Sequence, residues 1–341
     1  MSALAILWFV LIAVVMAGYF VLDGFDLGVG VLYPFLGKNE QDKAIMRRAI
    51  GPVWDGNEVW LLTAGGALFA AFAPAYATSF SGFYLAIMLV LMGLILRAVS
   101  LEFRAYADNK GIWDWTFFVG SLLPALLFGV AVGNVMAGIP LNANGDYTGT
   151  FFGLLTPFTL ICGVLGLVQM LFQGACWVSL KAPLGSDLRA SASKLRYPLG
   201  IAALLVFVIA TVLWFTTVLP GSSAEIGLTS LAFIFAFMYV IVMVLAIGMG
   251  SGSSSCDLLA FILTEAGCVC LIGLMAATLF PNLIVATDPA LSITIASAAG
   301  SDVTLGAMTV IAVIGVPLVL FYHVLVYRKF AGRITPEDLA H

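Results

Sequence analysis

The stretch "GPVWDGNEVWLLTAGGALFAAFAP" (51–74) opens a long apolar segment, yet its first turns carry Asp55, Asn57 and Glu58. An apolar segment of roughly 20 residues is long enough to cross the hydrocarbon of a bilayer as a helix. An ionisable group inside a membrane costs about 2.5–3.5 kcal/mol on insertion scales. The stretch therefore predicts a membrane-spanning helix with a specific role for the charged groups near its start.

The composition of the whole chain supports a membrane protein. Of its 341 residues, 62% are hydrophobic and 9% are charged, whereas soluble domains average about 25% charged residues. The mean hydropathy is +1.12. The apolar runs are long and do not alternate with polar residues, as the strands of a membrane barrel would. We therefore predict an all-α polytopic membrane protein.

Polar punctuation divides the chain into about nine apolar runs. The first run lacks a basic leader and a small-residue cleavage site, so we expect it to remain as a span rather than to be removed as a signal peptide. The predicted transmembrane helices cover residues 4–35, 52–73, 76–101, 114–138, 151–179, 197–219, 225–248, 258–280 and 303–327.

The basic residues predict the orientation. All 14 Lys and Arg residues fall at or after the ends of the first, third, fifth and ninth predicted helices. Cytoplasmic loops carry the excess of Lys and Arg. The N-terminus is therefore expected outside and the C-terminus in the cytoplasm. One missed helix would mix the two sides, so the partition also supports the count of nine.

Carboxylates from the first two helices gather toward the predicted cytoplasmic side. Asp23 and Asp26 lie three residues apart on one helix face, as do Asp55 and Glu58 on the next helix. Arg97 reaches the same depth at the end of the third helix.

Two interpretations fit this predicted cluster. It could tie the helices together as a structural network around Arg97, or it could carry protons inward from the cytoplasm. Carboxylates suit a proton relay because partial burial brings their pKa toward neutrality.

The remaining polar residues give fewer signals. Glu265 lies inside the eighth predicted helix, where it must be protonated and hydrogen-bonded or paired with an unidentified partner. Haem in a membrane is usually held by His with His or Met, but the chain has only His323 and His341. The five cysteines form no CxxC pair and are expected to be packing residues. No phosphate-binding, dinucleotide-binding or zinc motif occurs.

Several blocks resemble subunit II of the cytochrome bd quinol oxidases. They are "FVLDGFDLGVGVLYPF" (20–35), "GPVWDGNEVWLLTAGGALFAAF" (51–72), "SGFYLAIMLVLMGLILRAVSLEFR" (81–104), "IWDWTFFVGSLLPALLFGVAVGN" (112–134), "YTGTFFGLLTPF" (147–158) and "FAGRITPEDL" (330–339). The GFDLGVG and WDGN-x-VWL blocks are specific to that family. The similarity extends over nearly the whole chain and weakens over the sixth to eighth helices.

This resemblance implies two four-helix bundles plus one peripheral helix. We accordingly predict a first bundle at 1–138, a second at 139–280, and an external loop, ninth helix and cytoplasmic tail at 281–341. It also implies a partner, subunit I, that ligates haem b and haem d and oxidises quinol, in a complex that reduces O2 to water in the bacterial inner membrane. A small single-helix subunit and membrane lipid are further candidate partners, and no nucleic acid is expected.

The resemblance also implies roles for individual residues. Asp26 and Asp55 resemble carboxylates on a proton route toward the haems, and Trp60 resembles a tryptophan at an oxygen-access passage. We assign Glu58 to the same route, and Asp23 and Arg97 to its electrostatic support. Two features depart from the family pattern: the short link "PGSSAE" (220–225) and the carboxylate of Glu265.

Two other classes of function remain open at this point. The carboxylates could couple protons to a solute in a secondary transporter. Such transporters commonly interrupt helices near the midplane, whereas here the polar blocks crowd the inner side. The chain could also be a scaffold subunit in which Asp26 and Asp55 do not affect turnover.

Overall fold

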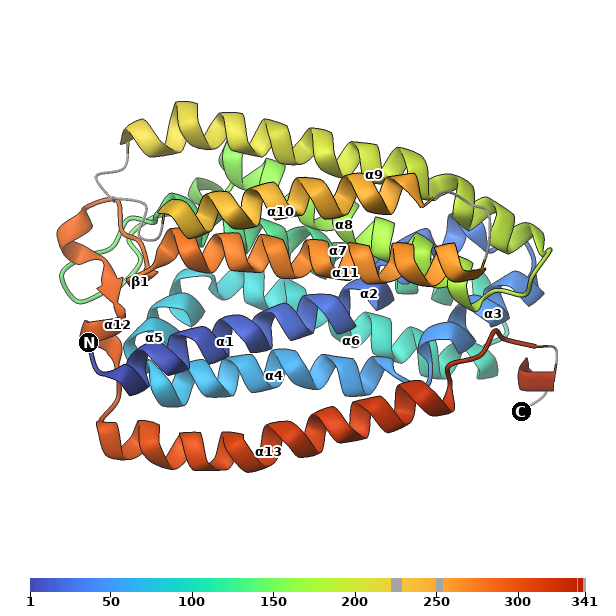
Figure 1. Ribbon diagram of the computed structural model, residues 1–341, viewed down its shortest axis with the longest axis horizontal. Coiled ribbons are helices and arrows are strands. Elements are labelled where there is room, and N and C mark those ends of the chain that lie inside the picture. The colour runs from blue at the N-terminus through green and yellow to red at the C-terminus, as the bar shows by residue number, and fades with distance from the viewer. Residues whose placement is uncertain (222–228, 250–253, 336, 340–341) are drawn as a thin grey trace.

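The structure, a computed structural model, describes residues 1–221, 229–249, 254–335 and 337–339. Long helices run side by side, with the N-terminus, α12 and β1 at one end and α3 and the C-terminal residues at the other (Figure 1). The helices and strands are α1 Ala3–Leu22, α2 Gly24–Leu36, α3 Glu40–Ile50, α4 Trp54–Ala71, α5 Ala73–Gly82, α6 Tyr84–Phe103, α7 Lys110–Ala137, α8 Pro157–Lys181, α9 Asp187–Leu213, α10 Thr229–Gly248, α11 Ser254–Leu279, β1 Asn282–Ile284, β2 Ile293–Thr294, α12 Ile295–Ala298 and α13 Asp302–Lys329.

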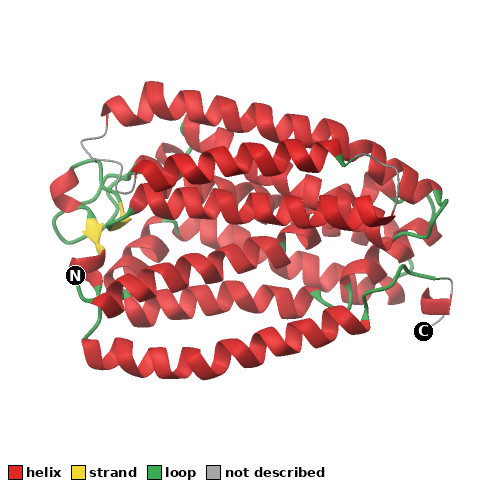
Figure 2. Cartoon of the chain, in the orientation of Figure 1, coloured by secondary structure: helices red, strands yellow, loops and turns green. Residues whose placement is uncertain are grey.

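The predicted all-α membrane fold is confirmed. Helix dominates every described layer, and strand is confined to the short β1–β2 pair at one end (Figure 2). Within the described residues, eight helical segments are long and apolar enough to cross a membrane. The predicted second span corresponds to α4, which is not among the eight because its first turns are polar, but which lies alongside α1 (Figure 1).

Three predicted helices differ in detail from those observed. The first is interrupted at Asp23, which ends α1 and precedes α2, although the break is mild because Asp23 keeps right-handed helical angles. The third is divided at Phe83 into α5 and α6. The sixth begins ten residues earlier than predicted, at Asp187 in α9, where the Ser186 side chain caps the first turn.

Two helices were not predicted at all, the one-turn α12 and the longer α3. The polar link after the first span contains α3, which is capped by the Asn39 side chain accepting a hydrogen bond from the Asp42 backbone. Ile45, Met46, Ala49 and Ile50 form its buried face. An amphipathic helix of this kind stabilises the loop by packing its apolar stripe against the bundle.

Backbone contact between α2 and α8 joins the first half of the chain to the second. A Cβ added to Gly28 would lie 1.8 Å from the Met170 carbonyl oxygen, and one added to Gly174 would lie 2.5 Å from the Gly28 carbonyl carbon. Only glycine permits so close an approach of two helices. The division into bundles at residue 138 stays a prediction, and the link at 220–225 lies largely outside the described residues.

Ion pairs fasten the helix ends at the end of the molecule that carries α3. Arg104 and Lys43 bind Asp114, and Arg104 also reaches Glu40 on α3. On the other half of the same end, the buried Asp257 accepts hydrogen bonds from three arginines at 2.8–3.1 Å: Arg189, Arg196 and Arg333. Arg333 lies beyond the last helix, so this contact fixes the C-terminal tail to α11.

Candidate functional site

The predicted carboxylate cluster meets around Arg97. The Arg97 side chain on α6 is fully buried, and its Nη2 donates to Asp23 Oδ1 at 2.7 Å and to Glu58 Oε1. Asp23 is also fully buried, whereas the Glu58 side chain is 25% exposed. Groups from three separate stretches of sequence therefore share one guanidinium, which offsets much of the cost of burying their charges.

Asp26 lies one turn from Asp23 and has a different partner. Its Oδ2 accepts a hydrogen bond from Asn57 Nδ2 at 2.7 Å, and both side chains are fully buried. The same Asn57 amide also donates to the Leu22 carbonyl, while its oxygen accepts from the Tyr327 hydroxyl at 3.1 Å. Asn57 thus connects Asp26 to α13, the last helix of the chain.

Several buried polar atoms of this site have no hydrogen-bond partner in the described protein. They are Tyr19 Oη, Asp23 Oδ2, Asp26 Oδ1, and Arg97 Nε and Nη1. Buried polar atoms are normally satisfied by protein groups, by ordered water or by a proton. A proton or an ordered water would satisfy the two carboxylate oxygens, whereas Arg97 Nε and Nη1 are donors that need an acceptor.

Asp55 stands apart from the buried groups. It lies in the first turn of α4, is exposed, and accepts a hydrogen bond from the Gly56 backbone at 2.8 Å. Among the described residues it has no ion-pair partner. It is one helical turn before Glu58, the part-exposed member of the Arg97 cluster. The four carboxylates therefore range from exposed through half-buried to fully buried.

Trp60 borders the cluster on the side of α13. Its indole packs against Gly18, where an added Cβ would lie 2.4 Å from the ring, and its Nε1 donates to His323 Nε2 at 3.2 Å. Because an indole nitrogen can only donate, His323 accepts at Nε2 and donates from Nδ1 to the Val319 carbonyl oxygen at 2.9 Å. His323 also stacks on Tyr327, whose hydroxyl donates to Asn57. Trp60 is therefore linked to Asn57 through His323 and Tyr327.

Glu265 extends the polar region toward the second half of the chain. Its Oε2 accepts from Gln173 Nε2 at 2.5 Å, and the same amide donates to the Phe20 carbonyl at 3.2 Å. Glu265 Oε1 and Gln173 Oε1 are buried without a partner in the described protein. The Gln173 side chain also contacts Gly24, between Asp23 and Asp26. The partner that the sequence left unidentified is therefore Gln173.

The neutral members of the site were given no role from the sequence. Four neutral side chains connect or surround the charged groups: Tyr19, Asn57, Gln173 and Tyr327. Of these, only Asn57 lies in the polar start of the segment 51–74. A signal existed for Gln173, since an amide in an apolar helix needs a partner. Tyrosines are common near membrane boundaries, which is why Tyr327 gave no signal.

The described donor set does not fit a haem. His323 is the histidine that the structure describes, and both of its ring nitrogens are hydrogen-bonded. The described residues contain no group of three or more His, Cys, Asp or Glu side chains that could hold a metal ion.

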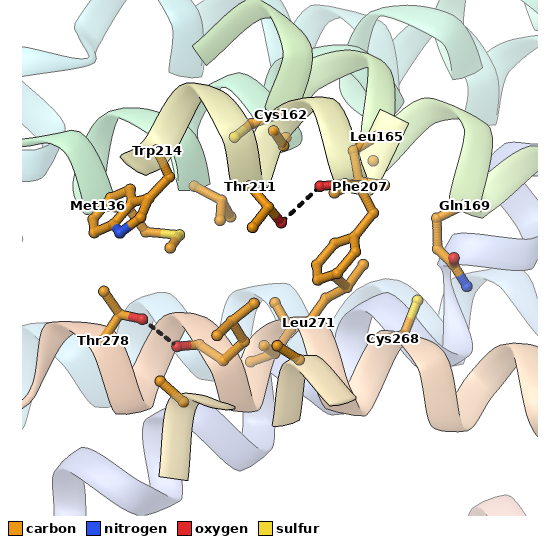
Figure 3. Close-up of a pocket in the computed structure, with 18 of the residues that line it drawn as sticks. Met136, Cys162, Leu165, Gln169, Phe207, Thr211, Trp214, Cys268, Leu271 and Thr278 are labelled. Carbon is orange, nitrogen blue, oxygen red and sulfur yellow. Dashed lines mark hydrogen bonds between the residues drawn. The ribbon is translucent and has the colours of Figure 1, made fainter. Parts of the chain in front are cut away.

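A separate apolar cavity of about 430 Å³ lies between α7, α8, α9, α10 and α11. Figure 3 shows Thr211 and Thr278 hydrogen-bonded back to backbone oxygens, with Met136, Trp214 and Leu271 on the walls. Gln169, at the right in Figure 3, donates a hydrogen bond to the Thr264 carbonyl oxygen and accepts one from the Tyr239 hydroxyl. Among the residues that the structure describes, no charged side chain lines the cavity, so it suits an apolar molecule and not the chemistry of the carboxylates.

Comparison with known proteins decides the family. The family model of cytochrome bd terminal oxidase subunit II matches residues 4–330. The chain belongs to this family. It is therefore a subunit of a multi-subunit terminal oxidase, an oxidoreductase of the bacterial inner membrane that contains haem and uses quinol. Family membership thus favours an oxidase over the secondary transporter.

Individual relatives cover most of the chain. The cytochrome bd-I ubiquinol oxidase subunit 2 of Escherichia coli strain K12 is 34% identical, over 99% of this chain and 97% of its own. Subunit 2 of the cytochrome bd ubiquinol oxidase of Bacillus subtilis is 32% identical over 99% of both chains. The probable cytochrome oxidase subunit 2 of Haemophilus influenzae is 47% identical, but the match spans 61% of this chain and 57% of that one.

A solved structure supports the fold independently. A chain of the bd oxidase from Geobacillus thermodenitrificans superposes with a TM-score of 0.77, covering 96% of this chain and 99% of that one at 15% identity. At this identity the likeness shows the arrangement of helices and not the roles of residues.

Proposed function

We propose that the chain is subunit II of a quinol:oxygen oxidoreductase and supplies a proton route from the cytoplasm. In this proposal its partner, subunit I, ligates haem b and haem d and oxidises quinol, while the complex reduces O2 to water. The E. coli and B. subtilis relatives are named as ubiquinol oxidases, which supports quinol as the substrate class. The unsuitable donor set around His323 supports placing the haems on the partner.

The proposed route begins at Asp55 and ends at Asp26. Asp55 is exposed and collects protons, Glu58 is half-buried one turn further, and Asp26 is fully buried. Arg97 pairs with Asp23 and Glu58 and offsets part of their negative charge, which lowers the cost of burying carboxylates along the route. The single observation that supports the route is the graded burial of Asp55, Glu58 and Asp26, together with the unpartnered buried oxygens of Asp26 and its neighbour Asp23.

The distribution of the basic residues supports an orientation in the membrane. The described Lys and Arg residues lie in α3, in the last turns of α6, α8 and α13, in the first turns of α7 and α9, or in the links beside these helix ends, and Figure 1 shows α3 at one end of the molecule. We propose that this end faces the cytoplasm, which puts Asp55 on the side from which protons are taken. The role of Trp60 in oxygen access stays a prediction, and the apolar cavity would take the chain of a membrane lipid.

Substitution of the carboxylates tests the route. Asp26→Asn keeps the volume and the Asn57 contact but removes the titratable group. We expect a fully assembled complex with normal haem content whose quinol and oxygen turnover falls by about 100-fold. Asp55→Asn should have a smaller effect, because water reaches that position. The double variant should lose little more than Asp26→Asn alone, since groups in series act as a unit.

Asp108→Asn provides the matched control, because Asp108 is an exposed carboxylate at the same end of the molecule but outside the cluster. It should leave turnover unchanged. Normal turnover in fully assembled Asp26→Asn and Asp55→Asn complexes would end the proton-route proposal and leave the scaffold role. The haem assignment is tested separately: b-type and d-type absorbance should appear with the complex and not with this chain alone.

A further inference from the structure

A second cavity, of about 250 Å³, lies at the α3 end of the molecule and has a different character from the apolar one. The end of α3, the end of α8, the end of α13 and the tail after it surround it. Four of its lining side chains are basic and one is acidic: Arg48, Lys181, Lys329, Arg333 and Asp338.

Lys181 is the most unusual of these side chains. It is 6% exposed, and no carboxylate of the described residues lies within ion-pair distance. Its ammonium donates to the Phe330 carbonyl and, at 3.5 Å, to the Gly332 carbonyl, and it lies 4.8 Å from the centre of the Trp177 ring. An ammonium has three donors, so two carbonyls leave one for a further acceptor. Buried charges are normally paired.

Of the other cations around this space, Arg48 and Lys329 form no ion pair with a carboxylate of the described residues, although Asp338 lies near enough to Arg48 to interact with it electrostatically. Arg48 and Lys329 lie 6.0 and 5.8 Å from the Phe330 ring centre. Arg333 is held by Asp257. The acidic side chain, Asp338, is turned to the Thr335 backbone and hydroxyl. The cavity is therefore a positively charged pocket whose floor includes Trp177.

The position of the cavity indicates which kind of anion it would bind. Lys329 ends α13, and the residues one and two turns earlier, Leu325 and Phe321, are large, apolar and exposed at 50% and 63%. A molecule seated in the pocket could thus lay apolar chains along α13. Basic pockets between membrane helices bind the headgroups of anionic lipids.

We propose that this cavity binds the phosphate of an anionic glycerophospholipid. The Lys181 ammonium and the Arg48 and Lys329 side chains bind the phosphate oxygens, and the acyl chains lie against the exposed face of α13. The lipid supplies the counter-charge that Lys181 lacks, and it fastens the tail at Phe330 and Gly332 to the bundle.

The test compares lipid binding by variants of the purified oxidase complex. Delipidated complex is titrated with phosphatidylglycerol in detergent, and binding is followed by native mass spectrometry and by the rise in unfolding temperature. Each Lys or Arg near an anionic lipid contributes about fivefold in affinity. The Arg48→Gln/Lys329→Gln double variant should therefore bind about 30-fold more weakly.

Two further variants sharpen the result. Arg328→Gln removes the same charge from the same helix end at a residue that does not line the cavity, and it should bind as the unchanged complex does. Asp338→Asn removes the acidic lining residue and should bind more tightly, by about fivefold. These substitutions leave Lys181 in place, so the contacts that hold the tail are kept.

Three outcomes would overturn the proposal. The affinity for phosphatidylglycerol could be equal in the double variant and in Arg328→Gln. Inorganic phosphate alone could stabilise the complex as fully as the lipid does, in which case the ligand is a soluble anion. The double variant could release the partner subunit with no change in lipid binding, in which case the cavity is a subunit contact.

Discussion

Removal of the Arg97 charge tests whether the buried cluster is one coupled unit. Arg97→Met leaves Asp23 fully buried without its ion-pair partner, whereas Glu58 can turn to water because a quarter of its side chain is exposed. Breaking a buried ion pair from one side costs about 3–5 kcal/mol. At about 2 °C per kcal/mol for a chain of this size, the unfolding temperature should fall by about 6–10 °C.

The partner substitutions set the order of effects. Asp23→Asn should cost about 3 kcal/mol, because it leaves Arg97 with Glu58 alone. Glu58→Gln should cost about 1 kcal/mol, the value of a solvent-accessible pair. Arg97→Met combined with Asp23→Leu removes both buried charges and fills the space with apolar atoms, so it should recover about half or more of the loss caused by Arg97→Met.

The assay is thermal unfolding of the purified complex at one fixed scan rate, because membrane complexes commonly unfold irreversibly. Lys110→Gln, a change at an exposed side chain, serves as the control and should shift the unfolding temperature by less than about 2 °C. The reasoning is refuted if Arg97→Met/Asp23→Leu is no more stable than Arg97→Met, because the two charges would then not be coupled.

Three other predictions follow from separate parts of the structure. Gly28→Ala should separate α2 from α8 and lower the free energy of unfolding by about 3 kcal/mol. Gly66→Ala, where nothing lies within 4 Å of the new Cβ, should be tolerated. Equal effects of the two substitutions would contradict the close contact of α2 with α8. The Arg104 hydrogen bond lowers the pKa of Glu40, so the stabilisation from this carboxylate is complete above the ordinary Glu pKa of about 4.3 and is lost as pH falls through the lowered value. Glu40→Gln should therefore unfold at a slightly lower temperature than the unchanged complex at pH 6, and the difference should vanish in acid; a difference that grew in acid would reverse the sign. A reporter inserted near Asn144 should read external, and a cytoplasmic reading would reverse the proposed orientation.

The sequence was most informative about the charged residues inside the membrane spans. Arg97 and the carboxylates Asp23 and Glu58 could be expected to meet, because an isolated charge in a membrane is costly enough to require a partner. Spacing along the helix could not distinguish Asp26, which binds Asn57, from Asp23, which binds Arg97. That difference depends on which side chain of α4 or α6 reaches each carboxylate, and tertiary packing decides this.

Short helices, and the neutral side chains that bind the carboxylates, could not be predicted from the sequence. The polar link around α3 reads as a loop, since only its buried stripe, which includes Ile45 and Ile50, reveals a helix. Gln173 could be expected to need a partner, but its pairing with Glu265 depends on the crossing of α8 with α11. Hydropathy defines the spans well because lipid imposes one simple requirement on every residue.

The contact of Asp257 with three arginines has a consequence for how the chain is made. Arg189 and Arg196 precede Asp257 in the sequence, whereas Arg333 follows it by 76 residues. Synthesis proceeds from the N-terminus, so the third pairing can form only after α13 has been translated and inserted. A truncated or stalled chain therefore lacks this ion pair, and the buried carboxylate distinguishes a finished subunit from an unfinished one.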